Sequence, residues 1–115
     1  MKRLRHAVSG LRQRRANNAN TALFLRTAMR LLHFNRIDGD YAEFGCQRFR
    51  TFQMAWQAVQ SQPIERKLWA YSSFDRIPEP QTARDRHPRG LPGTPLLSEA
   101  AFTQRCRWAG IGSRH

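Results

Sequence analysis

The sequence predicts an α/β fold with two parallel strands and three or four helices. Two short apolar segments, residues 41–45 and 68–71, have the composition of strands, and a helical pattern over residues 51–59 lies between them. A strand, a helix and a second strand within about 30 residues form a parallel crossover unit. A chain of 115 residues is long enough for one domain with a small core. We therefore expect one α/β unit flanked by further helices.

The N-terminal third is predicted to hold two helices separated by a polar break. Leu4, Val8 and Leu11 recur at helical spacing and give a basic segment a thin apolar stripe. The Asn-rich residues 17–21 are expected to end that segment and to cap a second helix over residues 22–34. This second helix shows the pattern of a packed amphipathic helix. Its expected core residues are Phe24, Leu25, Ala28, Leu31 and Leu32.

The central segment predicts the strands and the helix between them. The first strand is too apolar to alternate, so we expect it to be buried on both faces. Thr51 is placed to cap the central helix, which Pro63 follows closely. One side of that helix is expected to pack through Phe52, Ala55, Trp56 and Val59.

The C-terminal segment predicts a long loop followed by a last helix. Residues 75–97 hold five of the six prolines and show little periodicity, which favours a loop. Ser98 is placed to cap the last helix, and Gly110 is placed to end it. Phe102 and Cys106 lie four residues apart, so we expect them on one packed face.

The charge of the chain is unevenly spread. Of the formal net charge of +12, residues 1–36 contribute nine bases and no acid, whereas residues 37–80 hold five bases and six acids. We expect a basic arm over residues 1–20 and an α/β domain over residues 21–115. Such an arm is either solvated or contacts nucleic acid weakly and without sequence preference.

Several classes of protein are not indicated. Two cysteines without a Cys-x-x-Cys spacing predict neither a disulfide framework nor a zinc site. No apolar run approaches the ~20 residues of a membrane span. Arginines at positions 12, 14 and 15 interrupt the apolar stretch that a signal peptide needs, so we expect a cytoplasmic protein. An Arg-rich organellar transit peptide stays open as an alternative.

The most informative motif runs from residue 39 to residue 52. It reads Gly-Asp-Tyr-Ala-Glu-Phe-Gly-Cys-Gln-Arg-Phe-Arg-Thr-Phe, which is a turn, a short strand with an acid, a glycine and the start of a helix. A strand that ends at a glycine before a helix lets backbone N–H groups face an anionic ligand. The second strand is followed by Ser72 and Ser73, where a second ligand-binding loop belongs. Together the two segments predict a site for a nucleotide-type ligand.

The two segments together resemble the macrocin O-methyltransferase family. Its members typically read Gly-Asp-x-x-Glu-Phe-Gly, a helix, and a strand ending in Phe-Asp-Ser-Phe-x-Gly-Leu-Pro, and they use S-adenosylmethionine to methylate hydroxyls of sugars or natural products. The resemblance covers residues 31 to 112 and implies a Rossmann-like methyltransferase fold. Because the family's metal-binding acids and catalytic base belong to later strands, it implies a truncated half of that fold. A missing downstream segment or a second copy of the chain would then be its partner.

By this resemblance four residues are expected to bind the S-adenosylmethionine cofactor. Glu43 lies near the end of the first strand beside the ligand loop, but it fits equally an acid that balances a nearby arginine. Gly45 permits a close approach of the backbone to the ligand. Ser72 and Ser73 follow the second strand, at the ribose-binding loop. The catalytic residues stay unknown, since His87 in the long loop fits either a proton acceptor or a surface side chain.

The chain departs from the family pattern in both loops. Phe49 and Arg50 occupy the places of two further glycines, and Ser72 occupies the place of an aspartate that accepts both ribose hydroxyls. Loss of a charge-assisted hydrogen bond costs about 1.5–3 kcal/mol, which is roughly ten- to a hundredfold in affinity. We expect the isolated chain to bind S-adenosylmethionine weakly or not at all and to be inactive alone.

Two alternatives to this methyltransferase-like function stay open. The first is a non-catalytic basic binding module that contacts nucleic acid through residues 2–36. The second is a degenerate fragment without selected activity, which would explain the altered motif residues and the early stop together.

Overall fold

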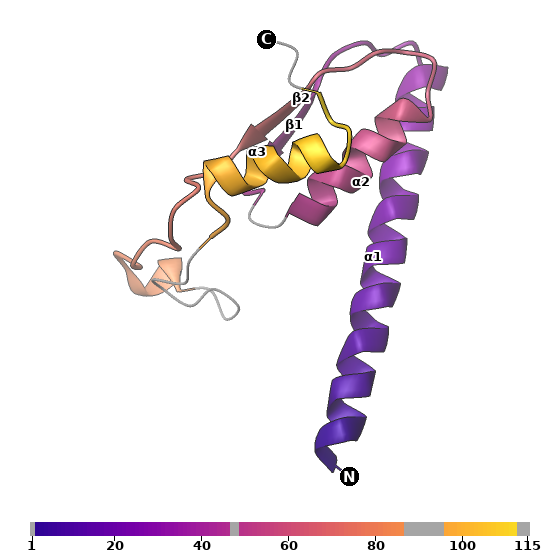
Figure 1. Cartoon of the computed structure of the whole chain (residues 1–115). Helices are drawn as coiled ribbons and strands as arrows, with labels where there is room; N and C mark the ends of the chain where they lie inside the picture. Colours follow the sequence, from indigo (N-terminus) through magenta and orange to yellow (C-terminus); the bar gives the residue numbers. More distant parts are fainter. Residues whose placement is uncertain (1, 47–48, 87–95, 113–115) are drawn as a thin grey trace. The chain divides into compact units, whose positions relative to one another are not determined.

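The computed structural model describes the backbone of residues 2–46, 49–86 and 96–112, with side chains from residue 8 onward. Along this part of the chain the elements are α1 (Lys2–Phe34), β1 (Tyr41–Phe44), α2 (Phe49–Gln60), β2 (Leu68–Tyr71), the 3-10 turn η1 (Ala83–Asp85) and α3 (Glu99–Trp108) (Figure 1). The predicted mixed α/β class is confirmed. The chain forms two compact units, one of Met1–Tyr41 with Met54–Lys67 and the other of Ala42–Gln53 with Leu68–His115.

The two strands form a parallel two-stranded sheet, as predicted. The N–H of Tyr41 donates to the carbonyl of Lys67 (2.9 Å), and the N–H of Gly45 donates to the carbonyl of Tyr71 (2.7 Å). Between these two bonds both strands advance by four residues in the same direction, which is the register of a parallel pair. The carboxyl ends of β1 and β2 therefore lie at one edge of the sheet.

The expectation that the first strand is buried on both faces is wrong. Half-buried and exposed residues alternate along β1 and along β2. Three of the four exposed positions carry aromatic side chains: Phe44 is 78% exposed, and Trp69 and Tyr71 are each 48% exposed. An apolar sequence over four residues cannot distinguish a strand covered on both faces from one covered on a single face.

The expected break in the N-terminal helix is also wrong, because α1 is one uninterrupted helix of 33 residues (Figure 1). The polar residues in its middle make hydrogen bonds within the helix instead of capping a new one. The Gln13 side chain donates to the Asn17 side chain (3.0 Å), and the Thr21 hydroxyl donates to the Asn17 carbonyl (2.9 Å). Asparagine and threonine are weak helix formers, yet their penalty is far smaller than that of proline.

The first unit has an aliphatic core supplied by α1 and α2. Leu25 and Met29 are buried one turn apart on α1, and the part of α2 in this unit buries three small side chains, Ala55, Ala58 and Val59. Small residues let helices approach closely, which favours tight helix packing. Of the expected core residues on α1, Phe24 and Leu31 are instead exposed, because they lie to one side of the Leu25 and Met29 stripe.

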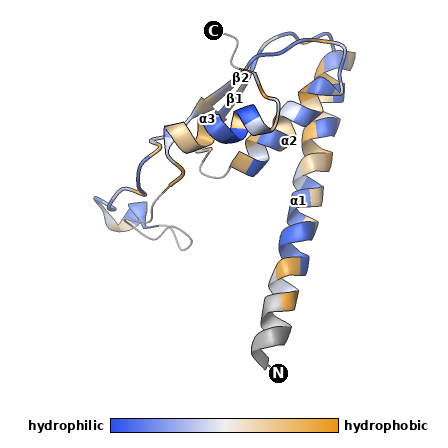
Figure 2. Ribbon diagram, viewed as in Figure 1, coloured by the Kyte–Doolittle hydropathy of each residue, from blue (hydrophilic) through white to orange (hydrophobic). Residues whose placement is uncertain are grey.

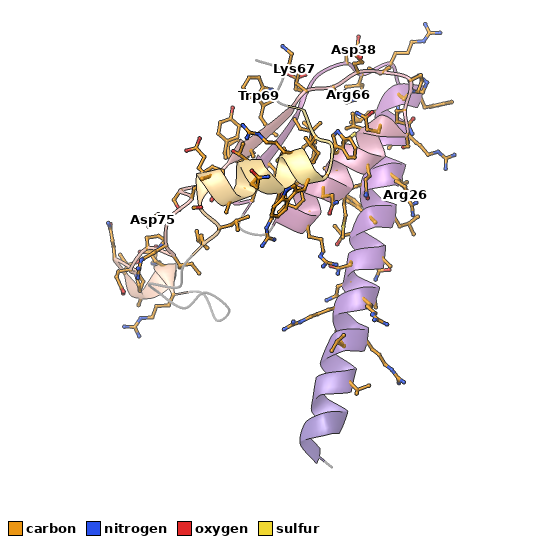
Figure 3. All side chains as sticks on the ribbon, in the orientation of Figure 1. Arg26, Asp38, Arg66, Lys67, Trp69 and Asp75 are labelled. Atoms are coloured by element: carbon orange, nitrogen blue, oxygen red, sulfur yellow. The ribbon has the colours of Figure 1, made fainter. Side chains whose placement is uncertain are left out.

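Polar contacts join the ends of the first unit's two chain segments (Figure 3). The guanidinium of Arg66 donates to the carbonyl of Gly39 (2.7 Å) and to that of Ile37 (2.6 Å). The backbone N–H of Lys67 donates to the Asp40 carboxylate (3.1 Å). These bonds hold the segment that leads from α1 into β1.

The second unit is organised around one phenylalanine of α3. Phe102 is buried, and its ring contacts those of Phe49, Phe52 and Phe74 at centroid distances of 5.6, 5.2 and 5.4 Å. Rings at such distances attract each other in edge-to-face and tilted arrangements. Three segments of the chain are therefore joined through a single side chain.

The predicted limits of α3 are confirmed. The Ser98 hydroxyl accepts a hydrogen bond from the N–H of Ala101 (3.2 Å), and Gly110 follows the helix with a left-handed φ of 76°. The expected cap at Thr51 is wrong, since α2 begins at Phe49 and Thr51 lies inside it. Trp56 is only half-buried on α2.

Candidate functional site

The four residues predicted to bind a cofactor lie at the carboxyl edge of the sheet, within the second unit. Glu43 is the third residue of β1, and Gly45 follows that strand directly. Ser72 and Ser73 follow β2 directly. The hydrogen bond from Gly45 to Tyr71 holds the two loops side by side. Ligands of open α/β sheets bind at this edge of parallel strands.

Gly45 has the backbone conformation that its position requires. Its φ is 77°, in the left-handed region where any side chain is strained, and a Cβ added there would meet no atom within 4 Å. The space above Gly45 is therefore open to a ligand. Its own N–H is already used in the bond to Tyr71, so a ligand would have to contact other groups of the loop.

Ser72 has a structural role in the loop after β2. Its hydroxyl oxygen accepts a hydrogen bond from the N–H of Phe74 (3.3 Å), which closes a short turn. Phe74 has a positive φ of 52°, unusual for a residue with a side chain, and its ring packs against Phe102. Ser73 is exposed. Ser72 thus keeps only its O–H and one lone pair for a ligand.

Cys46, directly after Gly45, was not predicted as part of the site. Its side chain is 2% exposed, and burial followed by the nearby Glu43 carboxylate raises the pKa of its thiol above 9.0. Burial and then the charge of Cys46 likewise raise the pKa of Cys106. Both thiols are free and stay protonated at neutral pH, which makes them poor nucleophiles.

The positions where the chain departs from the family pattern have different environments. Phe49 is buried against Phe102, so it is a core residue of this fold rather than part of a ligand cradle. Arg50 is exposed at the start of α2.

Two other polar residues follow the second strand. Asp75, three residues after Ser72, is exposed, and its backbone carbonyl accepts a hydrogen bond from the N–H of Leu96 (2.7 Å). His87 lies outside the described residues.

An aromatic surface on the sheet is a second feature that the sequence did not predict. The rings of Phe44 and Tyr71 are stacked, with centroids 4.9 Å apart and planes inclined by 10°. Trp69 lies two residues before Tyr71 and so shares its face of the sheet. An exposed face of a strand is normally recognised from polar residues at alternate positions. Here the exposed face is apolar in both strands, and the strands contain only one charged residue, so the sequence gives no such signal.

The helix α1 brings four arginines to one side. Arg12 and Arg30 are 18 residues apart, which is about five turns, and Arg15 and Arg26 are 11 residues apart, about three turns. All four are exposed, and Arg26 extends away from the helix (Figure 3). The predicted basic segment is thus a row of cations along a rigid element.

No protein-family model matches the sequence, and neither curated proteins nor solved structures give a match. Within the described ranges no three His, Cys, Asp or Glu side chains gather in a way that could hold a metal ion. A search of the described helices finds none with the length and apolar character needed to cross a membrane.

Proposed function

We propose that the carboxyl edge of β1 and β2 is the cofactor-type site of an S-adenosylmethionine-dependent O-methyltransferase-like protein. The acceptor class would be a hydroxyl of a sugar or natural product, and the sheet would be part of a Rossmann-like fold. Gly45 carries this proposal, since it ends β1 with a left-handed φ, is open above its Cα and is bonded to the end of β2. This is where ligands bind in open α/β sheets.

The proposal includes weak binding and no catalysis by this chain alone. The hydroxyl of Ser72 already accepts a hydrogen bond from the N–H of Phe74, so it offers a ribose only its O–H and one lone pair, both of them neutral groups. An aspartate at this position would keep the turn with one carboxylate oxygen and leave the other for the ribose. The wild-type chain is therefore expected to bind weakly, with a dissociation constant well above the micromolar range.

Calorimetric titration with S-adenosylmethionine tests this function. Replacement of Ser72 by Asp is expected to tighten binding at least about tenfold, because a charge-assisted bond is gained. Ser73→Asp is the matched control, since it adds the same charge at the next, exposed position. Adding Gly45→Val to the Ser72→Asp chain should abolish the gain, because valine does not tolerate the left-handed φ.

Two results would contradict the proposal. Equal affinities of the Ser72→Asp and Ser73→Asp chains would show that the loop after β2 does not face the ligand. Binding that survives Gly45→Val would show that the ligand lies elsewhere. A low-micromolar dissociation constant of the wild-type chain would contradict the weak binding but not the site.

A second candidate function, binding of nucleic acid without sequence preference, rests on α1. Arg12, Arg15, Arg26 and Arg30 line one side of this helix, and residues 1–36 contain no acid. Such a row can contact phosphates but offers little to distinguish bases. Affinity for mixed-sequence duplex DNA, measured by fluorescence anisotropy, should fall steeply with salt. Deletion of residues 1–15 should remove most of it, whereas tight, salt-resistant binding to one sequence would contradict this function.

A further inference from the structure

The helix α1 carries an exposed apolar stripe that neither proposed function uses. Leu23, Phe24, Leu31 and Phe34 are 59%, 69%, 60% and 83% exposed. Figure 2 shows hydrophobic segments among the hydrophilic ones along this helix. Exposed large apolar side chains are ordinary when scattered, but a contiguous patch indicates an interaction site.

The spacing of these residues places them on one side of the helix. Phe24 and Leu31 are seven residues apart, about two turns, and Leu23 and Phe34 are eleven residues apart, about three turns. Thr27 lies between Phe24 and Leu31 at a spacing of three and four residues. This is the alternation of three and four that forms the seam of a two-helix coiled coil.

We propose that the stripe formed by Leu23, Phe24, Leu31 and Phe34 binds the same stripe of a second copy of this chain, with the two α1 helices antiparallel. The buried side of α1 is a different one, since Leu25 and Met29 face the core of their own unit. Formation of the dimer therefore requires no rearrangement of that core.

The available area is sufficient for a small dimer interface. A phenylalanine buries about 150–250 Å² when fully covered, so the four exposed side chains together present on the order of 500 Å² per chain. Two copies would bury roughly 1,000 Å², which is the lower limit for a specific interface. The contact is thus expected to be reversible and concentration-dependent rather than permanent.

The distribution of charge favours the antiparallel orientation. The stripe lies in the C-terminal part of α1, and six bases without an acid lie N-terminal to it, between residues 2 and 15. In a parallel pair these two basic segments would lie side by side, at a cost from like-charge repulsion. In an antiparallel pair they project from the stripe in opposite directions. Arg30, on one flank of the stripe, then faces the same flank of the partner, so a smaller repulsion remains.

Sedimentation velocity over a range of protein concentrations tests the dimer. The wild-type chain should shift from monomer to dimer, and Phe24→Gln with Leu31→Gln should raise the dissociation constant about a hundredfold, because two apolar contacts are lost. Leu11→Gln is the matched control, since Leu11 is 56% exposed on the same helix but lies off the stripe. A wild-type chain that stays monomeric, or a dimer unaffected by the double substitution, would overturn the proposal.

Salt tests the contact and cross-linking tests its orientation. Salt should strengthen the dimer, because it screens the repulsion between the two basic helices. Gln13 lies fourteen residues, two heptads, before Thr27 on the same side of the helix, so two Gln13→Cys side chains would meet in a parallel pair and lie far apart in an antiparallel pair. Under oxidation the Gln13→Cys dimer should therefore give no more cross-linking than the wild-type background from Cys46 and Cys106. Dissociation by salt would contradict the apolar contact, and efficient cross-linking of Gln13→Cys would contradict the antiparallel arrangement.

Discussion

The two compact units use different kinds of contact. The first unit has an aliphatic core on two helices, with Leu25 and Met29 from α1 and small residues from α2. The second has an aromatic core in which three rings converge on Phe102. The first unit is stabilised by several buried aliphatic side chains, whereas the aromatic contacts in the core of the second unit all involve one side chain of α3, Phe102.

This difference determines how each unit should respond to a single substitution. In the first unit, truncation of one aliphatic side chain of the helix pair leaves the contacts between the other core side chains in place. Loss of Phe102, on α3, removes the shared partner of three rings, two of which belong to the start of α2 and one to the loop after β2. The second unit is therefore expected to be the more sensitive of the two.

The largest effect is expected for Phe102→Ala. A buried phenylalanine replaced by alanine costs about 3–5 kcal/mol of unfolding free energy, and here the ring contacts to Phe49, Phe52 and Phe74 are lost together. Hydrogen exchange measured by mass spectrometry should show loss of protection in α3 and in the loop after β2. Trp108→Ala is the control, because Trp108 is 78% exposed on the same helix and should change stability by less than about 0.5 kcal/mol.

A smaller effect is expected for Met29→Ala in the first unit. Replacement of the buried Met29 costs about 2–5 kcal/mol. We expect a value in the lower part of that range, because methionine is a flexible core residue whose site can partly close. Urea unfolding measures the change, with Leu11→Ala as an exposed control on the same helix. If Met29→Ala costs more than Phe102→Ala, the contrast between the two units is incorrect.

The sequence predicted those parts of the fold whose signals are local. Both strands, α2 and α3 lie where hydrophobic patterns place them, and Ser98 caps α3 as expected. The break at residues 17–21 was wrong because Asn17 and Thr21 bond within the helix rather than at its start. Residues 17–21 contain no proline, and the helix penalty of asparagine and threonine is too small to end α1 there.

The candidate site shows the same limit. The placement of Gly45, Ser72 and Ser73 at one edge followed from parallel strand order. The burial of Phe49 did not follow, because its ring packs against Phe102, which lies more than fifty residues away in the sequence. The burial of Cys46 was not predicted either. The exposed aromatic face of the sheet was missed since a four-residue apolar strand gives no sign of which faces are covered.

Arg66→Gln should have a still smaller effect, confined to the first unit. The substitution removes two hydrogen bonds from a guanidinium to the carbonyls of Gly39 and Ile37, which are exposed to solvent and therefore worth about 1 kcal/mol in total. Lys67→Gln is the matched control, because Lys67 bonds Asp40 through its backbone rather than its side chain. Faster hydrogen exchange at residues 37–41 in the Arg66 variant alone would support this role, and equal exchange in both variants would exclude it.

The smallest effect concerns pH and separates the second unit from the first, which contains no cysteine. Burial, and then Glu43, raise the pKa of Cys46 above the ordinary 9.0. Below that pH the thiol is protonated in the folded and the unfolded chain, and its contribution to stability is fully present. As pH rises past 9.0 the unfolded chain loses the proton first, so the unfolding free energy falls. Urea unfolding at neutral and alkaline pH should show a smaller fall for Cys46→Ala than for the wild type. Equal pH dependence in the two chains would mean that the Cys46 thiol is not desolvated in the folded protein.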